Sequence, residues 1–212
     1  SSFFLERGYV HGGNYHFEQK KLRACHLEPP RSELPKVFIS ELLLEQCSNE
    51  LQKIVDPLLR QVDATGLQSP AMLWRGRAWT AISKSTYDQL LAESEYAAWV
   101  AVFGFRANHF TVSVNHLNGF KTLAELNAWV KVQGFTLNGV GGEIKGGARV
   151  QLAQSSTLAD KVVVKLSDGD FELPCCFYEF AYRYPLADGG VFPGFITDNA
   201  DKIFESTNLQ NR

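Results

Sequence analysis

Two polar residues lie inside strand-like segments and are of the types that hold metal ions. His109 begins the segment HFTVSVN (109–115), and Glu179 lies within the apolar segment PCCFYEFAYRYP (174–185). Burying a carboxylate is costly unless it is paired or coordinates a metal. A histidine and a glutamate on neighbouring strands need one more histidine to complete the two-histidine, one-carboxylate face that holds Fe(II) and leaves positions open for substrate and O2.

Each of these residues also has an ordinary structural explanation. Side chains alternate between the faces of a strand, so Glu179 and Arg183 share a face and could form a buried ion pair. His109 heads a polar row that is either the wet side of a sheet or the wall of a site. The two rows of this strand are Phe110, Val112 and Val114 on one face and His109, Thr111, Ser113 and Asn115 on the other.

Other polar side chains could bind a small ligand that carries a carboxylate. In the run QLAQSST (151–157), Gln154, Ser155 and Ser156 offer an amide and two hydroxyl groups, although capping of a strand end is an equal alternative. His16 and His26 could be metal ligands, but we expect solvent-facing or hairpin positions for both. The candidates for substrate binding are Gln154, Ser155, Ser156 and Arg183.

The composition is that of an ordinary globular protein. The 212 residues are 45% hydrophobic and 21% charged, with a formal net charge of -2. The sequence has no block of like charges and no apolar run near the roughly 20 residues of a membrane helix, so we expect neither nucleic acid nor membrane as a partner. The start, SSFFLERGYV, lacks the pattern of a signal peptide, and we expect a cytoplasmic protein.

The four cysteines are expected to be reduced thiols of the core. They are Cys25, Cys47, Cys175 and Cys176, and they show no CxxC spacing for zinc or redox chemistry. Neighbouring cysteines in a strand point to opposite faces and rarely bond to each other. We therefore expect no disulfide between Cys175 and Cys176.

The hydrophobic spacing predicts strands at both ends of the chain and helices between them. NELQKIVDPLLRQV and TYDQLLAESEYAAWVAVFG have apolar residues three and four apart, which is typical of amphipathic helices, and Trp74 and Trp79 lie between them as packing residues. Residues 1–7 resemble the end of a helix, a turn is expected at 12–14, and residues 36–44 are expected to form a buried strand. A further helix, TLAELNAWVKVQ, ends at Gly134.

The two strand regions resemble each other as repeated β-α-β-β-β units. In each region a helix end is followed by a glycine and an aromatic residue, and then by a glycine turn into a strand. In this alignment Glu41 takes the place of Glu179, and the opening strand of the first unit would fall before Ser1. We expect one α+β domain with an incomplete first unit (1–47), a helical insertion (48–104), a second unit (105–197) and a C-terminal tail (198–212).

Seven segments along the chain resemble the 2-oxoadipate dioxygenase/decarboxylase family, also called 2-hydroxyglutarate synthases. They run in order from residue 20 to residue 207: KKLRA, PKVFISELL, ESEYAAWV, ANHFTVSVN, QSSTLAD, YEFAYR and ADKIFEST. The resemblance implies a vicinal-oxygen-chelate-like fold, in which paired β-α-β-β-β units form a cup around a metal.

The resemblance also implies Fe(II) held by two histidines and one glutamate. Carried over to this chain, His109 is the second histidine and Glu179 is the glutamate. The family's first histidine lies in a strand motif that this sequence does not contain, and we expect it upstream of Ser1 with a substrate-binding arginine. Glu41 would come close to the metal if the site resembled the glyoxalase-like branch, which has a second carboxylate.

The implied reaction converts 2-oxoadipate or a similar 2-oxo acid with O2 into 2-hydroxyglutarate and CO2. The 2-oxo acid would bind the metal through its carboxylate and keto oxygens. Two alternatives remain open at this point: a metal-dependent hydrolase or isomerase on the same fold, and a non-catalytic binding module.

Overall fold

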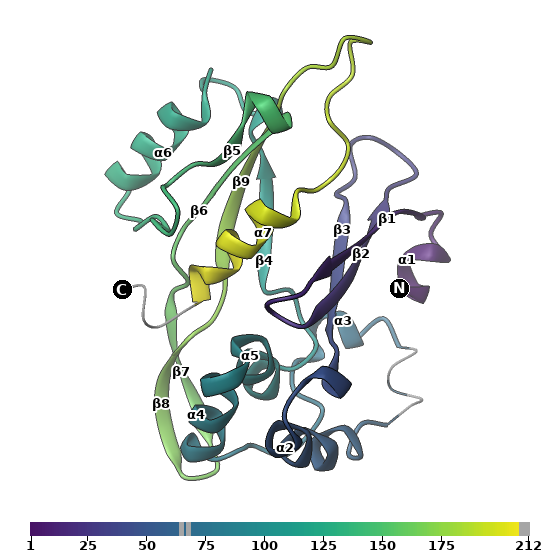
Figure 1. Ribbon diagram of the computed structural model, residues 1–212, viewed down its shortest axis with the longest axis vertical. Helices are drawn as coiled ribbons and strands as arrows, with labels where there is room; N and C mark the ends of the chain where they lie inside the picture. The colour runs from purple at the N-terminus through teal and green to yellow at the C-terminus, as the bar shows by residue number, and fades with distance from the viewer. Residues whose placement is uncertain (64–65, 67–68, 208–212) are drawn as a thin grey trace. The chain divides into compact units, whose positions relative to one another are not determined.

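A computed structural model describes residues 1–63, 66 and 69–207 of the chain (Figure 1). The chain is divided into two units by its contacts. One comprises residues 1–106 and 163–171, and the other comprises residues 107–162 and 172–212.

The second unit contains a four-stranded mixed sheet. Its strands are β4 (His109–Ser113), β5 (Lys145–Gly147), β6 (Leu152–Ser156) and β9 (Phe177–Arg183), in the order β4-β9-β6-β5. Strand β9 runs parallel to β4 and antiparallel to β6. Because helix α6 (Leu123–Val132) lies between β4 and β5 in the chain, the unit has the predicted β-α-β-β-β order. The hairpin of β7 (Lys161–Leu166) and β8 (Gly169–Pro174), which we had not predicted, is inserted before β9.

Helix α6 packs on one face of this sheet. It begins after Thr122, whose hydroxyl accepts a hydrogen bond from the Glu125 amide, as an N-cap residue does. The predicted end is confirmed at Gly134, which has a φ of +91° that favours glycine. The core on this side includes Val114, Leu126, Val130, Ala153 and Phe180.

Helix α7 (Thr197–Phe204) packs on the sheet through β5 and β6 and is the yellow helix of Figure 1. Ile203 is buried against Ala159 and Phe177. We had expected a tail from residue 198. Its described part is instead α7 and the 3-10 turn η5 (Glu205–Thr207), because Asn199 and Ile203, four residues apart, form one buried face.

The first unit contains a three-stranded antiparallel sheet. Helix α1 (Ser2–Leu5) is followed by Gly8 (φ +84°) and by β1 (Val10–Phe17), β2 (Leu22–Glu28) and β3 (Val37–Leu42). This helix-β-β-β order matches the second unit without its opening strand. The predicted turn at 12–14 is wrong: β1 continues through it with a bulge at 11–13. A Cβ at Gly12 would lie 2.1 Å from His26 Nε2, so only glycine fits there.

Helices occupy the chain segment between β3 and β4, as predicted. They are α2 (Asn49–Leu59), α3 (Met72–Arg75), α4 (Lys84–Glu93) and α5 (Glu95–Phe103), with short 3-10 turns η1 (Leu44–Gln46), η3 (Val114–His116) and η4 (Ala148–Val150) elsewhere. The packing role is confirmed for Trp79, whose indole donates to the Ala101 carbonyl (2.8 Å). It is wrong for Trp74, which is 68% exposed. Strand β3 is half-buried and not fully buried, because it is the edge of its sheet.

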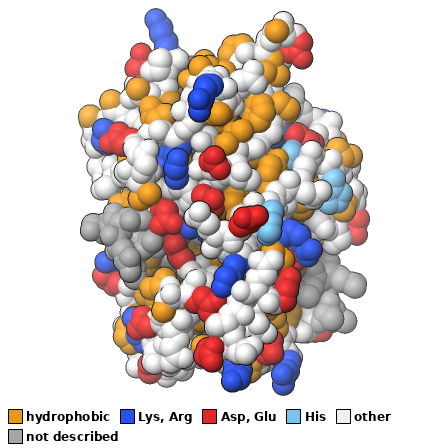
Figure 2. Space-filling model, viewed as in Figure 1, with side chains coloured by type: hydrophobic (Ala, Val, Ile, Leu, Met, Phe, Trp, Pro, Cys, Tyr) orange, Lys and Arg blue, Asp and Glu red, His pale blue; other side chains and the backbone are white. Residues whose placement is uncertain are grey.

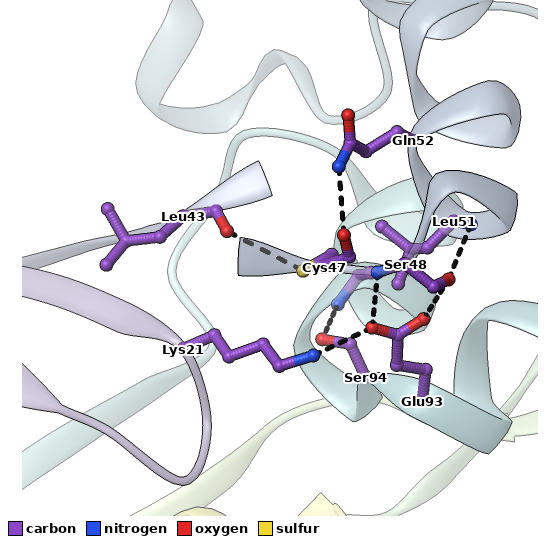
Figure 3. A network of polar contacts seen from close by, with 9 residues as sticks. Lys21, Leu43, Cys47, Ser48, Leu51, Gln52, Glu93 and Ser94 are labelled. Carbon is purple, nitrogen blue, oxygen red and sulfur yellow. Dashed lines mark hydrogen bonds and ion pairs between the residues drawn. The ribbon is translucent and has the colours of Figure 1, made fainter. Parts of the chain in front are cut away.

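A polar network ties three elements of the first unit together (Figure 3). The Glu93 carboxylate, at the end of α4, accepts hydrogen bonds from Lys21 Nζ (2.9 Å) and from the Ser48 amide (2.8 Å) and hydroxyl. Ser48 is the N-cap of α2 and accepts from the Leu51 amide. These hydrogen bonds, that of Lys21 first, lower the pKa of Glu93 to about 2.

Charged side chains of both signs are interspersed on the face shown in Figure 2. This distribution agrees with the small formal net charge of -2. Within residues 1–63, 66 and 69–207, the structure has no helix with the length and apolar character that crossing a membrane requires.

Candidate functional site

His109 and Glu179 lie on adjacent parallel strands of the second unit, and their side chains meet. His109 is the first residue of β4, and Glu179 is the third residue of β9, paired with Thr111 in the register. His109 Nε2 lies 3.3 Å from Glu179 Oε2. The His109 side chain is 20% exposed and that of Glu179 is 6% exposed, so solvent reaches this pair from the histidine side.

Three side chains fix the Glu179 carboxylate. Its Oε2 accepts a hydrogen bond from Thr111 Oγ1 (2.9 Å) and faces His109, while its Oε1 accepts from Gln154 Nε2. The Gln154 amide is fixed in turn, because Asn199 Nδ2 of α7 donates to Gln154 Oε1 (2.9 Å). Since Asn199 contacts the oxygen of this amide, the nitrogen is left to face Glu179.

These contacts keep Glu179 ionised despite its burial. Burial alone would raise the pKa of Glu179. The hydrogen bond and charge of His109, with the hydrogen bonds of Gln154 and Thr111, outweigh burial and hold the pKa below its ordinary value. The Glu179 carboxylate is therefore an anion at neutral pH and is suited to bind a cation.

The surroundings of His109 fit a metal ligand. Its Nδ1 lies 3.2 Å from Asn108 Oδ1, an acceptor, while Nε2 faces the Glu179 carboxylate, also an acceptor. A neutral imidazole has one N–H and can donate to only one of them, so with the N–H on Nδ1 the lone pair of Nε2 is available for a cation that Glu179 also contacts. Phe177 stacks on the ring at 4.6 Å and 13° and fixes its plane.

His109 and Glu179 are the side chains of this site that could serve as ligands of Fe(II). In the part of the chain that the structure describes, no three His, Cys, Asp or Glu side chains are grouped closely enough to hold a metal ion. An imidazole and a carboxylate are part of the donor set of the two-histidine, one-carboxylate site. The imidazole of His109 and the carboxylate of Glu179 therefore fit two of the three ligand positions of such an iron site. The third ligand is not assigned to a described residue.

The proposed substrate-binding residues have other partners in the structure. Gln154 contacts Glu179. Ser155 and Ser156 are fully buried: Ser155 donates to Asn127 Oδ1 of α6 (2.7 Å), and Ser156 Oγ lies 2.8 Å from Ser206 Oγ. Alternation along β6 sends the two hydroxyl groups to opposite faces, where each contacts a segment packed on the sheet. This arrangement does not present either serine to a ligand.

Arg183 and Glu41 also differ from expectation. The Arg183 guanidinium donates to the carbonyls of Phe192 (2.6 Å) and Gly194 (2.7 Å) and so anchors the segment that follows β9. Glu179 contacts Thr111, Gln154 and His109 in place of the ion pair with Arg183 that we had considered. Glu41 lies on β3 of the first unit, where its exposed carboxylate accepts from Arg23 Nε (2.8 Å).

The two other candidate histidines lie on the first sheet. His16 is exposed, as expected. His26 is only 3% exposed and lies on β2, so of the two expected positions the one in the β1–β2 hairpin is confirmed. Its ring nitrogens contact Tyr15 Oη (2.9 Å) and Glu28 Oε1 (2.9 Å), which satisfy it inside the unit.

The sequence model of the 2-oxoadipate dioxygenase/decarboxylase family matches residues 60–192. The chain belongs to this family. Two curated members are similar over 98% of the chain: the chloroplastic 2-oxoadipate dioxygenase/decarboxylase of Arabidopsis thaliana (37% identical) and the chloroplastic/amyloplastic one of Oryza sativa subsp. japonica (35%). The chain spans 62% and 64% of their lengths. Because their names place them in plastids, a cytoplasmic location of this chain stays a prediction.

Solved structures confirm the fold of this family member. The hydroxyglutarate synthase of Oryza sativa, in complex with 2-oxoadipate, is 33% identical with a TM-score of 0.92, and the match covers 99% of this chain and 75% of that one. A protein of Shewanella frigidimarina described as a "putative hydrolase" is 54% identical with a TM-score of 0.87, over 92% and 76% of the two chains. A glyoxalase superfamily structure from Ralstonia eutropha, described as "putative", is 20% identical with a TM-score of 0.74 over 92% and 67%. The predicted vicinal-oxygen-chelate-like α+β fold is therefore confirmed.

Proposed function

We propose that this family member is an Fe(II)-dependent 2-oxo acid dioxygenase/decarboxylase. It would convert 2-oxoadipate, or a similar 2-oxo acid, with O2 into 2-hydroxyglutarate and CO2. The observation that carries the proposal is the pair of His109 Nε2 and Glu179 Oε2, 3.3 Å apart, in a chain whose relatives are named for 2-oxoadipate.

His109 and Glu179 would hold the iron in this proposal. Bound Fe(II) would supply a redox centre for O2 and a template for the carboxylate and keto oxygens of the 2-oxo acid. Thr111 and Gln154 hold the carboxylate of Glu179, so that Oε2 faces the histidine. Phe177 shields one face of the imidazole ring from water.

The protein residues act as ligands and supports, and none of them acts as an acid or base. The proton on Nδ1 of His109 stays with the hydrogen bond to Asn108, which leaves the lone pair of Nε2 for the metal. The buried amide of Gln154 meets only one Glu179 oxygen and leaves Oε2 to face the histidine. Both residues thus keep their donor atoms fixed before substrate arrives.

The test is a turnover measurement on the full-length protein. Anaerobic loading with Fe(II), followed by mixing with O2 and 2-oxoadipate, should give O2 uptake and equal amounts of CO2 and 2-hydroxyglutarate. Absence of O2 uptake and of CO2 with 2-oxoadipate and with other short 2-oxo acids would refute the proposal.

A metal-dependent hydrolase or isomerase is the second candidate. The observation in its favour is the 54% identity to the Shewanella frigidimarina protein described as a hydrolase. Such an enzyme would consume substrate under argon with no need for O2. A non-catalytic binding module would bind 2-oxoadipate and leave it unchanged in both atmospheres. Parallel reactions in argon and air therefore separate the three functions.

A further inference from the structure

The thiols of Cys175 and Cys176 face each other. Their Sγ atoms lie 3.4 Å apart, although neighbouring residues of a strand point to opposite faces. The expectation of opposite faces is wrong here, because both residues lie in the irregular segment between β8, which ends at Pro174, and β9, which begins at Phe177. The irregular backbone of this segment brings the two sulfur atoms together.

The two cysteines differ in access to solvent. Cys175 is buried, with 8% of its surface exposed, whereas Cys176 is partly exposed. Cys176 Sγ also lies 3.5 Å from the Ala107 carbonyl oxygen. An accessible thiol with a second thiol in contact is the arrangement in which a first oxidation product is resolved as a disulfide.

We propose that Cys175 and Cys176 form an oxidation site that closes to a vicinal disulfide on reaction with a peroxide. The Cys176 sulfur attacks one oxygen of hydrogen peroxide, the O–O bond breaks, and a sulfenic acid and water form. The Cys175 sulfur then attacks the Cys176 sulfur, the S–O bond breaks, and a second water leaves. Two thiols and one peroxide thus give one disulfide and two waters.

The contacts of this segment connect the thiol pair to the candidate metal site. The Phe177 amide donates to the Asn108 carbonyl (3.4 Å), and its ring stacks on His109. A disulfide requires the sulfur atoms to approach to about 2.05 Å, which draws Cys176 away from Ala107 and distorts the peptide between Cys175 and Cys176, next to Phe177. Closure of the disulfide therefore moves the support of the His109 ring. This consequence rests on the proposed function, whereas the oxidation itself does not.

The oxidation is tested on the reduced full chain by mass spectrometry. After treatment with hydrogen peroxide and then an alkylating reagent, the peptide with Cys175 and Cys176 should be unalkylated and lighter by two hydrogens, and dithiothreitol should restore two alkylation sites. Cys25 and Cys47 are the internal controls and should stay alkylated. Direct conversion of Cys176 to a sulfinic acid, or a disulfide to another cysteine, would overturn the proposal.

Two variants make the result independent of one substitution. In Cys175→Ser the peroxide should leave Cys176 as a sulfenic or sulfinic acid, and in Cys176→Ser the oxidation of Cys175 should be slow. The variant with both Cys25→Ser and Cys47→Ser should oxidise as the natural chain does. Phenylarsine oxide, which bridges two close thiols, should bind one to one to the natural chain and fail to bind Cys175→Ser.

The connection to the metal site has its own measurement. Co(II) affinity, followed by its visible absorption, should fall about tenfold in the oxidised chain, as when other supports of a metal ligand are disturbed. The Co(II) affinity of the variant with both Cys175→Ser and Cys176→Ser should not change on treatment with peroxide. Equal affinity before and after oxidation would overturn the connection alone. Absence of any Co(II) binding by the reduced chain would instead count against the proposed function.

Discussion

Glu179 is the residue on which the candidate site depends most. Its two oxygens have different partners: Oε1 contacts Gln154, and Oε2 contacts Thr111 and His109. These three polar partners keep the buried carboxylate ionised.

Replacing Glu179 with Ala should abolish metal binding, because one of the two ligands is lost. The measurement is metal content after Fe(II) or Co(II) loading under argon. Glu143→Ala is the matched control, since Glu143 is a half-exposed glutamate of the same unit that pairs with Lys131. Retention of one metal ion per chain in Glu179→Ala would refute the assignment of the ligand.

Asn199 is a positioning residue in this scheme, because it acts through Gln154. Asn199→Asp should lower Co(II) affinity more than Asn199→Ala does, with a loss of about 10- to 100-fold. The new carboxylate would attract the Gln154 nitrogen, so the amide would turn and its oxygen would face Glu179. A merely structural role predicts the reverse order, since Asp has nearly the shape of Asn and Ala leaves a gap.

The sequence predicts some of these residues and not others. The meeting of His109 and Glu179 follows from alternation along two strands and from the β-α-β-β-β order, which places the opening and closing strands side by side. Asn199 could not be predicted, because its contact with Gln154 spans 45 residues and depends on where α7 packs. The only signal for Asn199 was its position four residues before Ile203, on the buried face of α7.

At the scale of elements, β9 does most to position the site. It pairs with β4 in parallel and with β6 in the antiparallel sense, so it brings Glu179 between Thr111 and Ser156. The break between β8 and β9 at Cys175 and Cys176 was not predictable from residue types, because PCCF is equally compatible with a continuous strand. The helices between β3 and β4 were predicted from apolar residues three and four apart, and serine N-caps begin three of them: Ser48, Ser83 and Ser94.

The network around Glu93 predicts an acid-sensitive contribution to stability. The pKa of Glu93 is lowered from 4.5 to about 2 in the folded chain, so its contribution is fully present above pH 4.5 and is lost as the pH falls towards 2. Glu93→Gln should therefore lower the melting temperature at pH 7, and the difference from the natural chain should shrink below pH 4.5.

Thermal unfolding between pH 3 and pH 7 measures this effect. Glu45→Gln is the control, because Glu45 lies in the nearby turn η1 and does not take part in the hydrogen bonds of Figure 3. A difference between Glu93→Gln and the natural chain that stays constant over this pH range would contradict the assignment.

At the scale of the whole chain, both units contain the same order of elements. In the first unit α1 precedes three antiparallel strands, and in the second α6 precedes three antiparallel strands and follows an opening strand that carries His109. The repeat was visible in the sequence because glycine–aromatic pairs, Gly8-Tyr9 and Gly134-Phe135, mark the end of each helix. The substrate could not be deduced from composition, since the small net charge favours no class of ligand.

The most direct test of the central claim is the fate of labelled oxygen. In the proposed reaction the bond between C1 and C2 of 2-oxoadipate breaks, C1 leaves as CO2, and both oxygen atoms of O2 enter the five-carbon product. With ¹⁸O₂ and the Fe(II)-loaded full-length protein, 2-hydroxyglutarate should carry two labelled oxygens, one in the new carboxylate and one in the hydroxyl group, while CO2 stays unlabelled. A product that takes its new oxygen from labelled water, or forms without O2, would contradict the claim.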